Sequence, residues 1–83
     1  MIVMRLKEYR SKAGLTQKML ADKSGVNIKT IQQYEQGQRN LDGAGLDILM
    51  GLAESLKIPF FNLIENEDLR DRLKNTITFY SKQ

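Results

Sequence analysis

The sequence predicts an all-helical protein. Its apolar residues recur at three- and four-residue steps along most of the chain, and no segment keeps the strict alternation of a half-buried strand. Glycine, threonine and asparagine interrupt these runs at places that suit helix ends and helix starts. With 83 residues, of which 41% are hydrophobic, the chain fits one small globular domain with modest stability.

Two short helices are predicted first. One carries Leu6 and Tyr9 on a single face and ends near Lys12, where Gly14 can stop it. The next begins at Thr16, whose hydroxyl can accept a hydrogen bond from the first turn. Three of its residues are expected to lie over the core, namely Met19, Leu20 and the aliphatic part of Lys23.

A third helix is predicted over residues 27–36, after a glycine at Gly25 that permits a left-handed turn. Asn27 can cap this helix, and Gly37 can end it. The helical period divides its residues into two faces. The inward face should hold Thr30, Ile31, Tyr34 and Glu35. The outward face should hold Ile28, Lys29, Gln32, Gln33 and Gln36.

The second half of the chain begins with a connection, residues 38–45, in which Asp42 is a plausible cap for the helix that follows. The apolar stripe of that fourth helix is Leu46, Leu49, Leu52, Ala53 and Leu56. Pro59 suits the first position of a short fifth helix, which carries Phe60, Phe61, Leu63 and Ile64. Asn66 can cap a last helix, whose apolar stripe is Leu69, Leu73, Ile77 and Tyr80.

Composition excludes several functions. Cysteine and histidine are absent, so disulfides, thiolate chemistry, nearly all zinc sites and the commonest general base are missing. The serines therefore have no histidine to activate them, and we expect no enzymatic activity, no metal and no cofactor. The longest apolar stretch, residues 48–53, is far shorter than the roughly 20 residues that cross a bilayer. The start of the chain lacks the apolar region of a signal peptide, so we expect a cytoplasmic protein.

Charge is distributed unevenly. Residues 1–40 carry eight Lys or Arg against three Asp or Glu, whereas residues 41–83 carry five against seven. The first part suits a phosphate-rich partner and the second part suits a protein, although such side chains also simply solvate helix faces.

The tight connection between the second and third helices makes them cross steeply and leaves the third protruding. The major groove of B-DNA is about 12 Å wide and admits one α-helix. The outward glutamines can donate and accept hydrogen bonds there, Lys29 can reach a guanine edge or a phosphate, and Ile28 can touch a thymine methyl. The alternative is an ordinary polar surface, since Gln and Lys are good helix formers.

A family resemblance supports the first interpretation. Residues 16–27, with Thr30, Ile31, Tyr34, Glu35 and Gly37 after them, resemble the helix-turn-helix of the phage-repressor (Cro/CI, Xre) family. The similarity extends from Leu6 to about Ile64. It implies a compact five-helix lambda-repressor-like DNA-binding domain in residues 1–64. Residues 65–83 are expected to be an additional C-terminal helix that either packs back on the domain or pairs with a second chain.

The resemblance also implies roles for individual residues. The expected DNA-binding residues are Gln17, Lys18, Asn27, Ile28, Lys29, Gln32, Gln33, Arg39 and Asn40. Gln17 matches a residue that braces the DNA backbone and can extend to a base, while Arg39 and Asn40 match positions that approach phosphate. Arg10 and Glu35 match an ion pair that ties the first helix to the third. Residues 38–45 depart from the family pattern because they are longer than its shortest versions and lack proline.

These observations predict a sequence-specific transcriptional regulator of double-stranded DNA, acting as a repressor and as a homodimer on a pseudo-palindromic site. The alternative is an antitoxin-type module that binds a small protein partner through its acidic C-terminal part and also binds DNA.

Overall fold

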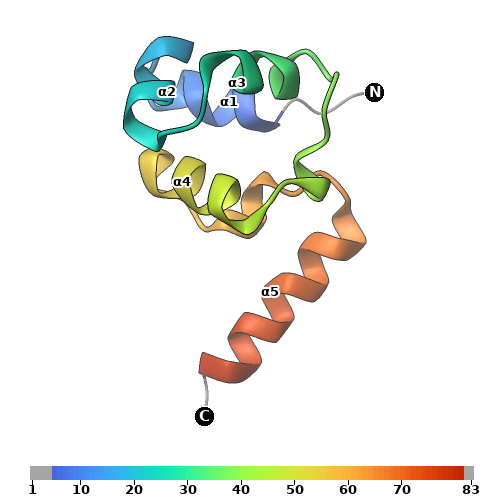
Figure 1. Cartoon of the computed structure of the whole chain (residues 1–83). Coiled ribbons are helices and arrows are strands. Elements are labelled where there is room, and N and C mark those ends of the chain that lie inside the picture. Colours follow the sequence, from blue (N-terminus) through green and yellow to red (C-terminus); the bar gives the residue numbers. More distant parts are fainter. Residues whose placement is uncertain (1–4, 82–83) are drawn as a thin grey trace.

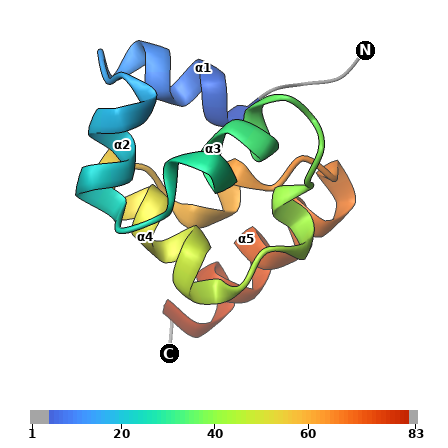
Figure 2. The ribbon, with the colours of Figure 1, turned by 45° about the horizontal axis from the view of Figure 1, so that its top comes forward.

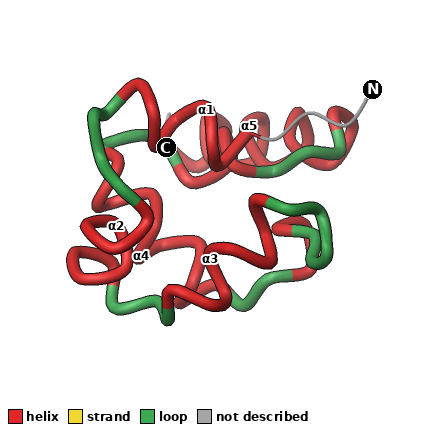
Figure 3. The backbone as a smooth tube through the Cα atoms, turned by 90° about the horizontal axis from the view of Figure 1, so that it is seen from above, coloured by secondary structure: helices red, strands yellow, loops and turns green. Residues whose placement is uncertain are grey.

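A computed structural model describes residues 5–81, and the side chains of residues 5–77. Within that range the chain is helical without strands, as predicted (Figure 3). Its α-helices are Arg5–Lys12 (α1), Gln17–Ser24 (α2), Ile28–Glu35 (α3), Leu46–Leu56 (α4) and Glu67–Ser81 (α5). Two 3-10 turns, Leu41–Gly43 (η1) and Phe60–Leu63 (η2), lie between them. None of the described helices is both long enough and apolar enough to cross a bilayer.

The core lies between a layer of α1, α2 and α3 and a second layer of α4 and η2 (Figure 1). One residue from each of α2, α3, α4 and η2 is fully buried at its centre, namely Leu20, Ile31, Leu52 and Leu63. The α5 helix extends away from this body on the side opposite α3 (Figure 1). Its main contacts are with η2, so only its first turns share the core.

Three predicted helix caps are confirmed. The Thr16 hydroxyl accepts the backbone N–H of Met19 at 3.1 Å, and Asn27 Oδ1 accepts that of Lys29 at 2.8 Å. Asn66 Oδ1 accepts the N–H of the residue three positions later at 2.9 Å. Gly25 has a φ of 75°, the left-handed conformation that ends α2 and turns the chain into α3.

The expectation that Met19 and Lys23 cover the core is wrong. Met19 is 44% exposed and Lys23 is also exposed. Met19 lies about 100° and Lys23 about 60° around the helix axis from Leu20, both on the same side. The α2 helix packs on α4 through Leu20 and its neighbours on that side, which turns Met19 to solvent.

The connection before α4 also differs from expectation. Leu41, on η1, is 2% exposed and belongs to the core. Asp42 does not cap α4, because Gly45 occupies that position without a side-chain hydrogen bond. The Asp42 carboxylate instead accepts the backbone N–H groups of Glu65 and Asn66 at 2.6 and 2.9 Å. By burying Leu41, the turn directs Asp42 toward the start of α5.

The predicted fifth helix is instead a single 3-10 turn, η2, which follows Pro59 and has only four residues. On α4, Leu46 is 64% exposed and so lies outside the core that its stripe predicts. On α5, Leu69 and Leu73 pack against the core, and Ile77 is 37% exposed. The side chain of Tyr80 lies outside the described residues.

Candidate nucleic-acid interface

The α3 helix lies on the surface with one face available to a ligand (Figure 2). Its inner face is fixed by Ile31, Tyr34 and Glu35, all of which are buried. On its outer face, Ile28 is 38% exposed and Lys29 is also exposed. Gln36 is exposed as well, and Gln32 and Gln33 are partly exposed. Because Val26 is buried just before α3, the helix is anchored at its start as well as along its inner face.

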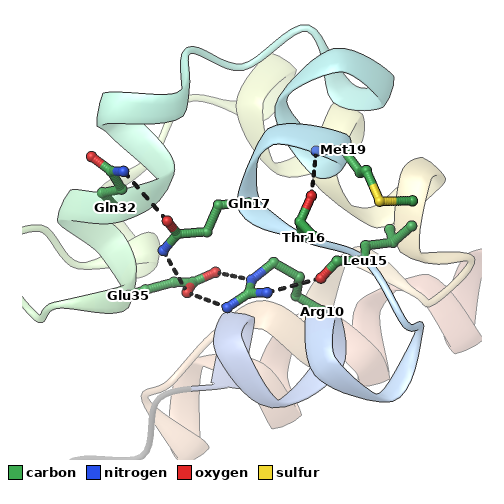
Figure 4. Close-up of polar contacts among 7 residues, drawn as sticks. All are labelled: Arg10, Leu15, Thr16, Gln17, Met19, Gln32 and Glu35. Atoms are coloured by element: carbon green, nitrogen blue, oxygen red, sulfur yellow. Dashed lines mark hydrogen bonds and ion pairs between the residues drawn. The ribbon is translucent and has the colours of Figure 1, made fainter.

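An ion pair joins α1 to α3 beneath this surface (Figure 4). Arg10 Nε and Nη2 donate to the two carboxylate oxygens of Glu35 at 2.7 and 3.0 Å, and Arg10 Nη1 donates to the Leu15 carbonyl at 2.8 Å. The side chain of Arg10 is 14% exposed and that of Glu35 only 3%. Hydrogen bonding to Glu35 raises the pKa of Arg10 in spite of its burial. The pair is therefore a largely buried, charged contact with two hydrogen bonds, and these two bonds fix the orientation of both side chains.

Gln17, the first residue of α2, extends this contact to the outer face of α3 (Figure 4). Its Nε2 donates to Glu35 Oε1 at 3.1 Å, and its Oε1 accepts from Gln32 Nε2 at 3.3 Å. The sequence predicts separate DNA contacts for Gln17 and Gln32 but does not predict this contact between them. The three-residue spacing of Gln32 and Glu35 could have indicated it, because residues three apart lie on the same side of a helix and can contact the same side chain, here that of Gln17.

Two asparagines near α3 have fixed amide orientations: Asn27 caps the start of α3, and Asn40 caps the start of η1. Asn27 Oδ1 accepts the N–H of Lys29, and Asn40 Oδ1 accepts the N–H of Asp42, both at 2.8 Å. Both asparagines are exposed, and within the described part of the chain their NH₂ groups have no hydrogen-bond partner. Each asparagine therefore presents a donor to solvent, which is the group that a phosphate oxygen accepts.

Two cations flank the outer face of α3. Arg39 is exposed and borders two shallow hollows, one shared with Asn27 and the other with Asn40. Lys18, near the start of α2, pairs with Asp22 at 3.3 Å, but their side chains are 79% and 69% exposed. A pair so open to water contributes little stability and is easily exchanged for a contact with phosphate.

A model of the helix-turn-helix family matches residues 6–61 of the chain. The chain belongs to this family. The match is of the phage-repressor type (Cro/CI, Xre), so α2 and α3 are the two helices of a DNA-binding helix-turn-helix regulator. It begins in α1 and ends in η2, and therefore includes Arg10, Gln17 and Glu35 but not α5. A search of the curated proteins found no match.

Proposed function

We propose that this helix-turn-helix protein binds a specific sequence in double-stranded DNA and represses transcription, with α3 lying in the major groove. The observation that carries the proposal is the division of α3 into a buried face held by the Arg10–Glu35 pair and an outer face of hydrogen-bonding side chains. A rigid helix with such a face supplies what base readout requires.

The outer face has residues suited to both kinds of DNA contact. Base edges are assigned to Ile28, Lys29, Gln32 and Gln33. Phosphate contacts are assigned to Gln17, Lys18, Asn27, Arg39 and Asn40. Lys18 and Arg39 are exposed cations, and the asparagines present NH₂ donors, so the phosphate assignments agree with the chemistry of these groups. None of these roles requires a catalytic group, a metal or a cofactor. We also propose that the protein acts in the cytoplasm.

A domain of this size makes few contacts with DNA, so we propose that it acts as a homodimer on a two-fold symmetric site. The half-sites would lie about 34 Å apart, one turn of the duplex. The α5 helix lies on the side of the body opposite α3, so pairing through α5 would leave α3 open to DNA (Figure 1).

Selection from random duplexes at two salt concentrations tests this proposal. We expect enrichment of a symmetric sequence and a steep fall in affinity with added salt, since bound cations displace counterions from DNA. Gln33→Ala should relax preference at one base pair. Arg39→Ala should weaken binding to all sequences and reduce the salt slope by about 1. Equal losses on selected and random duplexes for both variants would contradict the assigned roles.

A second candidate function is the antitoxin-type module, because α5 extends from the body and begins with the acidic residues Glu67 and Asp68. In this case α5 would bind a small protein while α3 still bound DNA. A stoichiometric partner should then copurify with the full chain. Deletion of the residues after Ile64 should abolish that association and leave duplex binding intact, whereas an unchanged association would exclude α5 as the contact.

A further inference from the structure

We infer that the base pair beneath Gln32 presents an exocyclic amino group, of adenine or cytosine, to α3. This inference rests on the proposed function, because it specifies what one position of the reading helix recognises. It follows from a relay of side chains, Arg10, Glu35, Gln17 and Gln32, in which each member fixes the orientation of the next (Figure 4).

The relay begins at a group that can only accept hydrogen bonds. Glu35 is nearly inaccessible to water, and Arg10 donates to both of its carboxylate oxygens. An ionised carboxylate has no hydrogen to donate. Whatever polar group approaches Glu35 from the side of α2 must therefore be a donor.

That group is the amide of Gln17. An amide has a donor end and an acceptor end of nearly equal size, so it can usually rotate by half a turn at little cost. Here a half turn would place the Gln17 oxygen against Glu35 Oε1, where the NH₂ group now lies at 3.1 Å. The carboxylate thus orients Gln17 with its oxygen toward α3, and Gln17 acts as a positioning residue.

The same reasoning orients Gln32. Its NH₂ group donates to the Gln17 oxygen at 3.3 Å, and a half turn would bring two oxygens together. Its own oxygen points away from Gln17 (Figure 4). Gln32 therefore presents its oxygen on the outer side of α3, and of its two N–H donors only the one that does not bind Gln17 remains, although a glutamine in isolation could present either end.

An outward acceptor discriminates among bases. In the major groove, adenine N6 and cytosine N4 are donors, whereas guanine O6 and N7 and thymine O4 are acceptors. Phosphate oxygens are acceptors as well, so the oxygen of Gln32 gains nothing from the DNA backbone. The position read by Gln32 should thus favour adenine or cytosine, by about three- to tenfold for a single hydrogen bond.

The test compares base preferences in duplexes selected by the wild-type protein and by variants. Gln32→Met locates the position, since only there should the base preference disappear. Gln36→Met, at the exposed C-terminal cap of α3, is the matched control. Gln17→Met keeps a similar shape and removes both hydrogen bonds. It should free the Gln32 amide to rotate, so that guanine and thymine become tolerated at that one position.

Two further variants make the test independent of any loss of folding in Gln17→Met. Gln32→Glu, combined with Gln17→Met so that no carboxylate oxygen faces the Gln17 oxygen, retains outward acceptors and should keep the preference for adenine or cytosine. Gln32→Lys presents only donors and should change the preference to guanine. A general loss of stability would lower affinity for all duplexes without moving the preference at one position.

The inference would be overturned by a wild-type preference for guanine or thymine at that position, or by no change of preference in Gln17→Met. It would also be overturned if Gln32→Met altered no position while Gln33→Ala did, and in that case the proposed function would stand. Enrichment of no sequence by the wild-type protein would instead reject the proposed function itself.

Discussion

Gly51 on α4 lies directly against the backbone of Ser24 at the end of α2. A Cβ placed on Gly51 would be 2.8 Å from the Ser24 carbonyl oxygen, closer than real Cβ atoms approach such atoms. The contact lets α2 and α4 pack at short distance. The first residue of α2 is Gln17, which accepts a hydrogen bond from Gln32 of α3.

Gly51→Ala should therefore destabilise the protein. Alanine favours a helix over glycine by about 1 kcal/mol, but here it must push apart two helix backbones, an overpacking cost of about 1 to 3 kcal/mol. We expect a net fall in the free energy of unfolding in urea denaturation. Gly43→Ala is the control, because its Cβ would meet nothing within 4 Å. Equal stabilities of the two variants would contradict the steric explanation.

Arg10→Met should cost about 3 to 5 kcal/mol of stability, because it leaves the carboxylate of Glu35 buried without its cation. Thermal or urea unfolding measures this loss. The double variant Arg10→Met with Glu35→Leu removes both charges and should recover much of it. If the double variant is as unstable as Arg10→Met, the loss comes from packing and not from an unpaired charge.

Asp42→Ala should loosen the attachment of α5. The carboxylate accepts two backbone N–H groups, at Glu65 and Asn66, and their loss should cost about 1 to 3 kcal/mol. Hydrogen exchange at these two amides should accelerate more than exchange in α3. Asp71→Ala, an exposed acid on α5, serves as the control. Unchanged exchange at both amides would exclude Asp42 as the residue that holds this junction.

Glu65 gives a prediction for the pH dependence of stability. Burial raises its pKa above the usual 4.5, the charge of Asp42 raises it further, and Arg5 acts in the opposite direction. A carboxyl with a raised pKa in the folded state favours folding when protonated, and this contribution is lost as the pH rises through that pKa. Glu65→Gln should therefore be more stable than the wild type at pH 7, and the difference should shrink as the pH falls through the raised pKa and below 4.5.

Unfolding curves of both proteins between pH 7 and pH 3 measure this difference. A constant difference across the range would mean that the substitution acts through packing and not through the charge of Glu65.

Sequence alone was sufficient for the features that depend on neighbouring residues. The caps at Thr16, Asn27 and Asn66 and the left-handed turn at Gly25 involve groups within about one helical turn, so local chemistry predicts them. The division of α3 into inner and outer faces follows from the helical period, and the helix-turn-helix family follows from the spacing of these features.

Packing between helices decided the rest. An apolar stripe allows a range of rotations about the helix axis, and only contact with α4 selected the one that exposes Met19. Asp42 binds amides 23 and 24 residues away, and Gln17 is oriented by a carboxylate 18 residues away. A hydrogen bond over such a separation exists only after the core has formed, because the chain between its two ends has no local preference that brings them together.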